Sequence, residues 1–419
     1  MSAVVIVGLG YVGLSLAMRA VEAGHQVVGY DSDVRRVQLL GSGISYVEDV
    51  PSEQLAAAVT SRAFRPSADA QACASFDIAI IAVPTPLRAG VPDLRHLEAA
   101  ACTLARYLRV GATVIVESTS YPGTTQELVQ PALESGSGLT AGPDFHLGYS
   151  PERIDPGNTI WTLAAIPKVV SGIDEDSVKV IEAFYKTIVD TTYVVSSPRE
   201  AELAKLIENT FLHINIALVN ELAMLAHDLR LNVWEAIDAA ATKPFRFMSF
   251  TPGPGAGGNC VPVDPAYLSW WVEHRLGRPF RFANLAREIN ENMPYYVVNR
   301  LLAGLNSRGE FVEGARVLLL GLAYKKNTGD VRESPAIRVA QLLANLGAEV
   351  RAADPHVVTP TDVDLIVTRV HPTCAELDSA DVVVLLTDHD VFDFDQISRL
   401  GRYCFDCRNR LSGSNVEAL

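Results

Sequence analysis

Short runs of aliphatic residues recur along the first half of the chain, and each ends at a polar or glycine-rich turn. The runs are Val4–Val7, Gln26–Tyr30, Ile78–Val83 and Thr113–Glu117. Runs of this kind, without regular polar alternation, are typical of strands buried on both faces of a parallel sheet. Leu14–Ala23 follows the first run and predicts a helix. Residues 1 to about 195 therefore predict a doubly wound α/β domain.

The same pattern restarts at about residue 313. Ala315–Ala323, Glu349–Asp354 and Asp381–Leu386 are expected strands, and Ser334-Pro335 is expected to open a helix. This half is similar to a second nucleotide-binding α/β domain that lacks the full glycine fingerprint. We expect it to bind a different nucleotide from the first half.

A long amphipathic stretch lies between the two halves. It runs from Glu202 through Leu229 with no Pro or Gly inside it, and a helix of about 30 residues is long for a globular domain. We therefore expect two Rossmann-like doubly wound parallel-sheet domains joined by a long central helix, which also carries a homodimer interface. The expected divisions are an N-terminal α/β domain (1–196), a central helical domain (197–300) and a C-terminal α/β domain (301–419).

The turn after the first expected strand contains Gly8, Gly10 and Gly13, with Tyr11 and Val12 between the last two. In a dinucleotide-binding domain the first glycine makes the tight turn, the second lets the pyrophosphate approach the backbone, and the third lets the helix pack on the strand. The amides at the N-terminus of the helix then face the phosphates. The alternative is a tight turn in another kind of α/β domain.

Asp31 ends the second expected strand, where an acid accepts hydrogen bonds from the adenosine ribose. Its charge would repel a 2′-phosphate, so we predict NAD rather than NADP as the cofactor. Arg35 and Arg36 lie close by and weaken that preference, and Arg36 is itself a candidate contact to the cofactor. The turns Pro84-Thr85-Pro86 and Ser118-Thr119 end the next two strands and are expected to line the same crevice.

Composition narrows the class of protein. The 419 residues are 48% hydrophobic and 20% charged, with a formal net charge of −14 and 6 cysteines. This acidity argues against a general binder of nucleic acid or anionic membranes. No run of about 18 apolar residues and no basic leader is present, so we expect a cytoplasmic protein with reduced thiols and no membrane span. Cys404 and Cys407 have CxxC spacing but no second pair, so we expect no metal.

The segment Pro252–Asp264 sets Cys260 in a run of glycines and prolines. Glycines let a backbone pass close to a ligand, so we expect this thiol to face a substrate, although a structural cysteine beside a turn is the alternative. A thiol can attack an aldehyde to form a thiohemiacetal, which can lose a hydride to give a thioester that water hydrolyses to a carboxylate. Beside a nicotinamide site, this predicts a double oxidation that passes two hydrides to two NAD molecules in turn.

Other polar residues are suited to assist such a thiol. Lys205 and Asn209 are spaced i, i+4 and share one helix face, for which a solvated surface is the alternative. A nearby cation such as Lys205 would favour the thiolate. Asp264 or Glu152 could serve as the base for water or for the alcohol.

Together these segments resemble the nucleotide-sugar 6-dehydrogenases of the UDP-glucose/GDP-mannose dehydrogenase family, most closely the branch that oxidises UDP-N-acetylhexosamines. The resemblance runs essentially from end to end. It rests on segments that occur in the family's order: Gly8–Gly13, Val83–Pro86, Glu117–Thr119, Ser150–Glu152, Glu202–Thr210, Asn220–Leu222, Gly257–Asp264, Gly321–Asn327 and Asp330–Pro335.

The resemblance implies a role for each matching residue. Cys260 would be the nucleophile, assisted by residues that stabilise the oxyanion or handle protons and water: Lys205, Asn209, Asp264 and Glu152. Residues beside the nicotinamide or reaching the NAD would be Pro84, Thr85, Ser118, Thr119 and Arg332. Residues holding the sugar nucleotide would be Glu152, Arg153, Lys205, Asn209, Pro254, Gly255, Gly257, Lys325 and Arg408, with Arg246 contributed across a dimer interface.

Three positions depart from the family's patterns. Pro156 replaces a second glutamate of many UDP-glucose enzymes, Asn259 precedes the cysteine where the N-acetylhexosamine branch usually has His, and Leu212 stands where that branch often has Arg. These leave the sugar open between glucose, N-acetylglucosamine and N-acetylmannosamine, carried on UDP or dTDP. A two-electron hydroxyacid dehydrogenase and a non-catalytic nucleotide-sugar-binding module are the alternative functions, and the first would give Cys260 no task.

Overall fold

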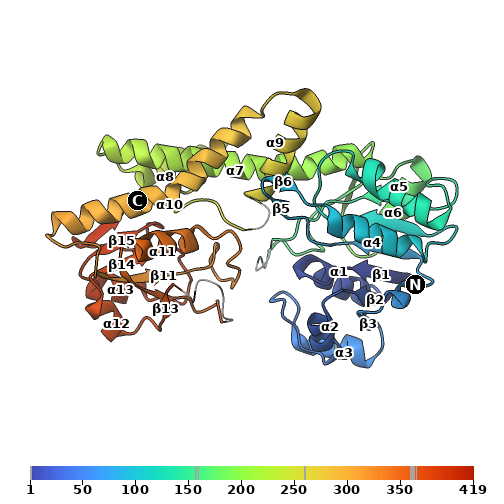
Figure 1. Cartoon of the computed structure of the whole chain (residues 1–419), viewed down its shortest axis with the longest axis horizontal. Coiled ribbons are helices and arrows are strands. Elements are labelled where there is room, and N and C mark those ends of the chain that lie inside the picture. Colours follow the sequence, from blue (N-terminus) through green and yellow to red (C-terminus); the bar gives the residue numbers. More distant parts are fainter. Residues whose placement is uncertain (1, 156–157, 159, 259–260, 359–363, 365) are drawn as a thin grey trace. The chain divides into compact units, whose positions relative to one another are not determined.

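The computed structural model describes residues 2–155, 158, 160–258, 261–358, 364 and 366–419. The chain divides into two compact units, Met1–Glu208 and Asn209–Leu419. Each unit contains its own six-stranded parallel sheet, drawn in blue to teal for the first and in orange to red for the second (Figure 1). The predicted α/β class with two doubly wound sheets is therefore confirmed.

The first sheet has the strand order β3-β2-β1-β4-β7-β8, and every neighbouring pair is parallel. Its strands are β1 (Ala3–Val7), β2 (Gln26–Tyr30), β3 (Phe64–Ser67), β4 (Ile78–Ile81), β7 (Thr113–Val116) and β8 (His146–Tyr149). The order reverses between β1 and β4. In such sheets ligands bind outside the carboxyl ends of the strands at this reversal.

Helices cover both faces of this sheet because consecutive residues of β1 point to opposite sides. Val4 and Ile6 belong to one apolar cluster and Val5 and Val7 to another. The helices of the unit are α1 (Tyr11–Glu22), α2 (Val34–Gly41), α3 (Ser52–Thr60), α4 (Arg95–Ala105), α5 (Gln130–Ser137) and α6 (Glu175–Tyr185). Smaller elements are η1 (Ala70–Cys73), the π-helical turn η2 (Thr125–Val129), and the strand pairs β5 (Leu87–Arg88) with β6 (Val91–Pro92) and β9 (Lys168–Val170) with β10 (Thr192–Val194).

The second sheet repeats the strand order of the first, as β13-β12-β11-β14-β15-β16. Its strands are β11 (Arg316–Leu320), β12 (Glu349–Ala353), β13 (Thr368–Arg369), β14 (Val382–Leu385), β15 (Cys404–Asp406) and β16 (Val416–Ala418). Here too β11 alternates, with Val317 and Leu319 in one cluster and Leu318 and Leu320 in the other. The associated helices are α11 (Pro335–Asn345), α12 (Cys374–Ser379) and α13 (Phe394–Leu400).

The predicted long helix is also confirmed. Helix α7 (Pro198–Asp228) has 31 residues, begins in the first unit and continues into the second. It is followed by α8 (Val233–Ala241), α9 (Val263–Leu276) and α10 (Arg281–Ser307). The division into three domains stays a prediction, because the two compact units meet inside α7.

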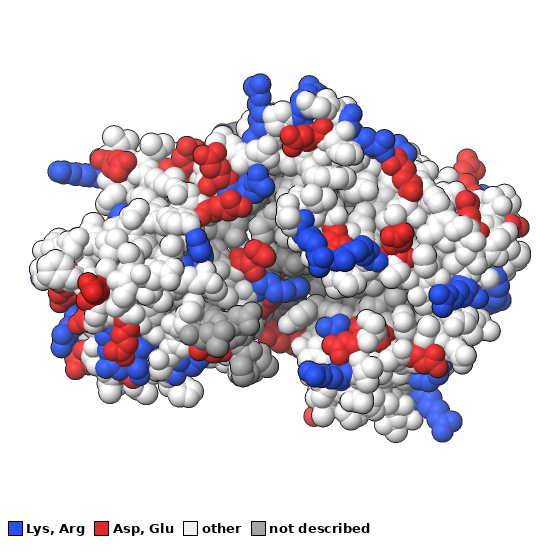
Figure 2. Space-filling model, viewed as in Figure 1, with Lys and Arg blue, Asp and Glu red and all other residues white. Residues whose placement is uncertain are grey.

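The surface charge, the helices and the acidic and thiol side chains are relevant to binding of nucleic acid, membranes and metals. Lys and Arg side chains are interspersed with Asp and Glu over the face shown in Figure 2, rather than gathered in one broad basic patch. Within the described ranges, no helix is long and apolar enough to cross a membrane. Within the same ranges, no group of three or more His, Cys, Asp or Glu side chains is placed to hold a metal ion.

Candidate active site

The turn between β1 and α1 holds its three glycines in different environments. Gly8 has a φ of +92°, and a Cβ added to it would lie 2.4 Å from the carbonyl oxygen of Ala82. A Cβ on Gly13 would lie 1.8 Å from the carbonyl oxygen of Gly8, so α1 packs on β1 only with glycine there. A Cβ on Gly10 would meet nothing within 4 Å. The backbone at the start of α1 is therefore open to approach, as a bound pyrophosphate requires.

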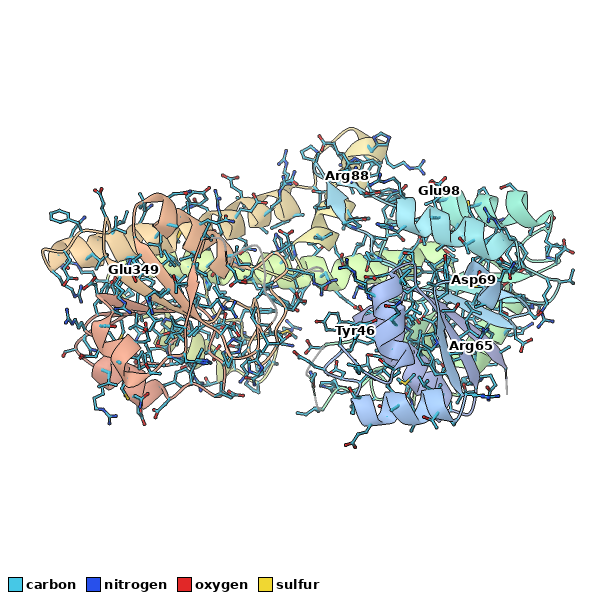
Figure 3. The ribbon with its side chains drawn as sticks, turned by 60° about the horizontal axis from the view of Figure 1, so that its bottom comes forward. Tyr46, Arg65, Asp69, Arg88, Glu98 and Glu349 are labelled. Atoms are coloured by element: carbon cyan, nitrogen blue, oxygen red, sulfur yellow. The ribbon has the colours of Figure 1, made fainter. Side chains whose placement is uncertain are left out.

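Asp31 orders this turn besides carrying the charge at the ribose position. It is 6% exposed. Its Oδ2 accepts hydrogen bonds from the Leu9 amide at 2.8 Å and from Arg36 Nη1 at 2.9 Å, and its Oδ1 accepts one from the Asp33 amide at 2.9 Å. Arg36 lies over the ring of Tyr46, labelled in Figure 3, whose hydroxyl donates to the Leu9 carbonyl. Arg36 is thus held by the acid, an arrangement that fits NAD.

The ends of β4 and β7 are tied together by Ser118. Its Oγ accepts a hydrogen bond from the Val83 amide at 2.9 Å and lies 2.8 Å from the Val83 carbonyl oxygen. Pro84 and Thr85 follow directly on the β4 side, and Thr85 is buried. On the β7 side Thr119 is half-buried. Ser118 therefore joins the ends of the two strands, and Thr119 is its more accessible neighbour.

Glu117, the residue before Ser118, forms a buried ion pair that the sequence did not reveal. The Glu117 carboxylate is 2% exposed and lies 3.0 Å from Lys168 Nζ, while Tyr185 donates its hydroxyl to the same carboxylate. Lys168 Nζ also donates to the Pro151 carbonyl at 3.1 Å. Lys168 therefore connects the loop after β7 with the loop after β8. It lies in none of the motifs, so nothing in the sequence marked it.

The loop after β8 and helix α7 bring Glu152 and Lys205 together. Lys205 Nζ donates to the Glu152 carbonyl at 2.6 Å and lies 3.3 Å from its carboxylate, whose other oxygen accepts the Ile154 amide. Both residues are buried, so a cation is fixed beside an acid. Arg153, by contrast, pairs with Glu208 on α7. The sequence singled out Glu152, Arg153 and Lys205, and the structure places only Glu152 and Lys205 in one contact.

In the second unit, Asn209 and Asp264 form a buried pair. Asn209 Nδ2 donates to Asp264 Oδ2, and the two residues are 7% and 2% exposed. Asp264 lies in the first turn of α9, where the helix dipole stabilises a carboxylate. Cys260 lies outside the described residues, as do Asn259 and Pro156.

The glycine-rich loop packs tightly against two walls of the second unit. A Cβ on Gly253 would lie 2.7 Å from Arg408 Nη1, and one on Gly255, which has a φ of +132°, would lie 2.8 Å from the Asn290 carbonyl oxygen. The Gly253 amide donates to Asn220 Oδ1 at 2.9 Å, and Asn220 Nδ2 donates to Asn290 Oδ1 at 2.9 Å. Asn290 was not anticipated, because a single polar residue inside a helix carries no sequence signal of its own.

The loop that contains Lys325 also packs against the glycine-rich loop. A Cβ on Gly257 would lie 2.6 Å from the Cβ of Tyr324, the neighbour of Lys325. The amide of Gly258 donates to the Arg332 carbonyl at 3.0 Å. The guanidinium of Arg332 pairs with Asp330 at 2.6 Å. Of the predicted site residues in this unit, Arg408 and the backbone of Arg332 therefore contact the glycine-rich loop, and Tyr324, the neighbour of Lys325, packs against it.

The second unit has a similar glycine turn after β11, but the acid beside this turn is enclosed by protein groups. Gly321, with a φ of +86°, follows β11, and Asp354 ends β12. Asp354 Oδ2 accepts the amides of Leu322 at 2.7 Å and Ala323 at 2.9 Å, and lies 3.1 Å from His389 Nε2. The side chains of Asp354 and His389 are 0% exposed. This acid is therefore unavailable to a ribose.

Family models match the chain in three consecutive parts. They describe the NAD binding domain (residues 2–189), the central domain (199–292) and the UDP binding domain (318–413) of the UDP-glucose/GDP-mannose dehydrogenase family. A relative named UDP-N-acetyl-D-glucosamine 6-dehydrogenase, from Pseudomonas aeruginosa, is 39% identical over 358 residues, which cover 84% of this chain and 83% of the relative.

Solved structures with similar folds extend over nearly the whole chain. The UDP-D-ManNAc dehydrogenase of Pyrococcus horikoshii has a TM-score of 0.89 at 32% identity, covering 99% of this chain and 98% of that one. A UDP-glucose dehydrogenase of Pyrobaculum islandicum has a TM-score of 0.87 at 31% identity, covering 100% of this chain and 96% of that one. The similarity therefore includes both units and the helices between their sheets.

Proposed function

Because this chain belongs to the UDP-glucose/GDP-mannose dehydrogenase family and is an NAD-dependent nucleotide-sugar dehydrogenase, we propose that it oxidises a UDP-sugar at C6 to the uronic acid in two successive steps. The observation that carries this proposal is the buried Asn209–Asp264 pair. It holds an acid that follows Cys260 by four residues in the sequence and lies in the first turn of α9, after the glycine-rich loop.

The proposed chemistry centres on the Cys260 thiol. The C6 alcohol first loses a hydride and a proton to give the aldehyde. The sulfur then adds to the aldehyde carbon, and loss of a second hydride and proton from this thiohemiacetal leaves a thioester. Water breaks the carbon–sulfur bond, which yields the carboxylate and returns the thiol. NAD, when bound at the Gly8–Gly13 turn, accepts the hydride in each oxidation.

Two sets of side chains are proposed to support these steps. In the first unit, Lys205 supplies a fixed positive charge for the oxyanion, and its contact with Glu152 keeps the ammonium in place. In the second unit, Asp264 takes up protons or orients the water, and Asn209 fixes the orientation of its carboxylate. The sugar nucleotide would be held by the glycine-rich loop together with Lys325 and Arg408.

The substrate class is proposed as UDP-glucose or a UDP-N-acetylhexosamine. The match to the family's UDP binding domain and the names of the relatives support this choice. Leu212 and Asn259 differ from the residues usual in the N-acetylhexosamine branch, so glucose stays within the proposal.

A count of NADH per sugar tests the function. Purified protein and NAD are mixed with UDP-glucose, UDP-N-acetylglucosamine, UDP-N-acetylmannosamine, UDP-galactose, dTDP-glucose or GDP-mannose, and the NADH formed is compared with the sugar consumed. We expect two NADH per sugar and no steady-state turnover in a Cys260→Ser variant. One NADH per sugar would indicate a simple alcohol oxidation, and none with any sugar would refute the proposed reaction.

We also propose that the protein is a homodimer formed through α7. Leu218, Leu222, Leu225 and Leu229 are 50%, 42%, 52% and 68% exposed. Their spacing of four, three and four residues puts them on one face of α7 and its end, and a monomer rarely leaves such an apolar stripe in water. Arg246 is exposed as well, with a φ of +56°, and is proposed to reach the partner's substrate.

Light scattering coupled to size-exclusion chromatography tests the dimer. A Leu222→Glu/Leu225→Glu variant is expected to elute as a monomer, because two charges would be buried in the apolar contact. Glu221→Gln, an uncharged change next to the stripe, is the matched control and should leave the dimer intact. A dimer of unchanged mass in the double variant would place the interface elsewhere.

A further inference from the structure

Glu202 is a buried acid that the proposed reaction leaves without a task. It lies three residues before Lys205 on α7 and is 0% exposed. Its Oε2 accepts the amide of Gly123 at 2.5 Å, and its Oε1 accepts both the amide and the hydroxyl of Thr125, at 2.8 Å and 2.7 Å. One carboxylate therefore holds the segment that leads into the π-helical turn η2.

This segment directly continues the loop after β7 that contains Thr119. Ser118 is anchored to Val83 on one side of Thr119, and Gly123 and Thr125 are anchored to Glu202 on the other. Between these anchors Thr119 is half-buried, in the loop that follows β7. The backbone that carries Thr119 is thus anchored on both sides, and Glu202 provides the anchor on the C-terminal side.

We propose that Glu202 is a positioning residue for the nicotinamide end of the cofactor site, acting through Gly123 and Thr125 on the loop that presents Thr119. This rests on the proposed function in one respect, the location of Thr119 beside the nicotinamide. Lys205, one turn later on α7, holds the loop after β8 through Glu152. The start of α7 therefore fixes two neighbouring loops at the same edge of the sheet.

The ionisation state of Glu202 determines how its two oxygens share these hydrogen bonds. Burial raises the pKa of its carboxyl to about 7, against the opposing effect of the hydrogen bonds from Thr125 and Gly123 and of the Arg199 charge. Arg199 is 53% exposed and is paired with Glu127. The ionised carboxylate can accept all three hydrogen bonds, and the protonated carboxyl can still accept the Gly123 amide when its proton lies on Oε1, facing the Thr125 hydroxyl.

Binding measurements without any sugar test the inference. In Glu202→Gln, an amide –NH₂ faces the Gly123 N–H, so a buried donor meets a buried donor. We expect the dissociation constant of NADH to rise about tenfold, because one lost hydrogen bond is of that size. ADP-ribose, which lacks the nicotinamide, should bind within about twofold of wild type.

The controls separate positioning from general damage. Glu200→Gln changes an exposed acid of the same helix and should leave both affinities unchanged. Thr125→Val removes only the hydroxyl bond and is expected to weaken NADH about threefold, which provides a second test if the Gln variant does not fold. In a Thr119→Ala background the Glu202→Gln change should cost less NADH affinity than in wild type.

Two results would overturn the inference. One is NADH affinity in Glu202→Gln equal to that of wild type. The other is an equal loss of NADH and ADP-ribose affinity, which would indicate a merely structural role. Failure of the proposed reaction is distinguishable from both, because it would show as absent turnover with every sugar while these titrations proceed.

Discussion

Replacing Glu202 by glutamine is expected to change stability in opposite directions at acidic and at alkaline pH. Burial raises the pKa of this carboxyl to about 7 in the folded protein, whereas in the unfolded chain it has its ordinary value, about 4.5. Between these two values the folded state binds more protons than the unfolded state. The contribution of Glu202 to stability is therefore greatest below its unfolded pKa and declines as the pH rises through 7.

The two pKa values set the size of the effect. A difference of about 2.5 units at about 1.36 kcal/mol per unit gives a decline of ~3 kcal/mol. Glutamine does not titrate, but it loses the hydrogen bond from Gly123, a constant cost of ~1 kcal/mol. The variant should thus be less stable than wild type by ~1 kcal/mol at about pH 4.5, and more stable by ~2 kcal/mol at about pH 8.

Thermal unfolding of the two proteins at matched ionic strength measures this crossover. For a unit of the size of Met1–Glu208, ~2 kcal/mol corresponds to a shift of about 4–8 °C in the midpoint of its transition. Glu200→Gln serves as the control and should differ from wild type by the same amount at each pH above about 5, because a hydrogen bond from Ser197 keeps the pKa of the exposed Glu200 low. A difference between Glu202→Gln and wild type that does not vary with pH would refute the reasoning.

Four further substitutions test the cofactor turn and the buried lysine. Gly10→Ala should fold normally, since its Cβ meets nothing within 4 Å, yet bind NAD at least tenfold more weakly by titration, whereas Gly13→Ala, with a Cβ 1.8 Å from a carbonyl oxygen, should lower the melting temperature as well. Asp31→Ala should raise the KM for NAD about tenfold and leave kcat nearly unchanged, as steady-state kinetics would show. Lys205→Met should lower kcat by about two orders of magnitude or more while NAD titration stays normal.

The parts of the molecule that the sequence predicted are those determined by near neighbours. The strand, glycines and helix of Val4–Ala23 form one continuous segment, and Asp31 meets the turn because β2 pairs directly with β1. Each of these features has a short-range signature, either an uninterrupted aliphatic run or a glycine at a position with a positive φ. The same holds for α7, whose length follows from the absence of Pro and Gly within it.

The parts that the sequence did not predict depend on distant partners. Glu202 lies 79 positions from Gly123, and Lys168, the first residue of β9, bonds the carbonyl of Pro151 from 17 positions further along the chain. In the sequence, an isolated acid or lysine looks the same whether its side chain is bonded to water or to a distant backbone group. Only the packing of α7 against the carboxyl edge of the sheet removes water from Glu202 and gives it a structural task.

The glycine turns after β1 and after β11 have similar backbones but differ at one side chain. Gly8-Leu9-Gly10 in the first unit corresponds to Gly321-Leu322-Ala323 in the second, and in both the first glycine has a positive φ. The position that is open at Gly10 is occupied at Ala323 by a methyl group in a fully buried residue.

The acid after the neighbouring strand is also less accessible in the second unit than in the first. The side chain of Asp31 is 7% exposed, whereas that of Asp354 is 0% exposed, accepts four backbone amides and lies against His389. The second turn is also not followed directly by a helix, because α11 begins only at Pro335. It therefore lacks both the accessible acid and the helix N-terminus with which the first turn would hold a ribose and a pyrophosphate. The family model for the second unit is a UDP binding domain, so a nucleotide bound there would have to contact other residues, such as Arg408, which packs against the glycine-rich loop.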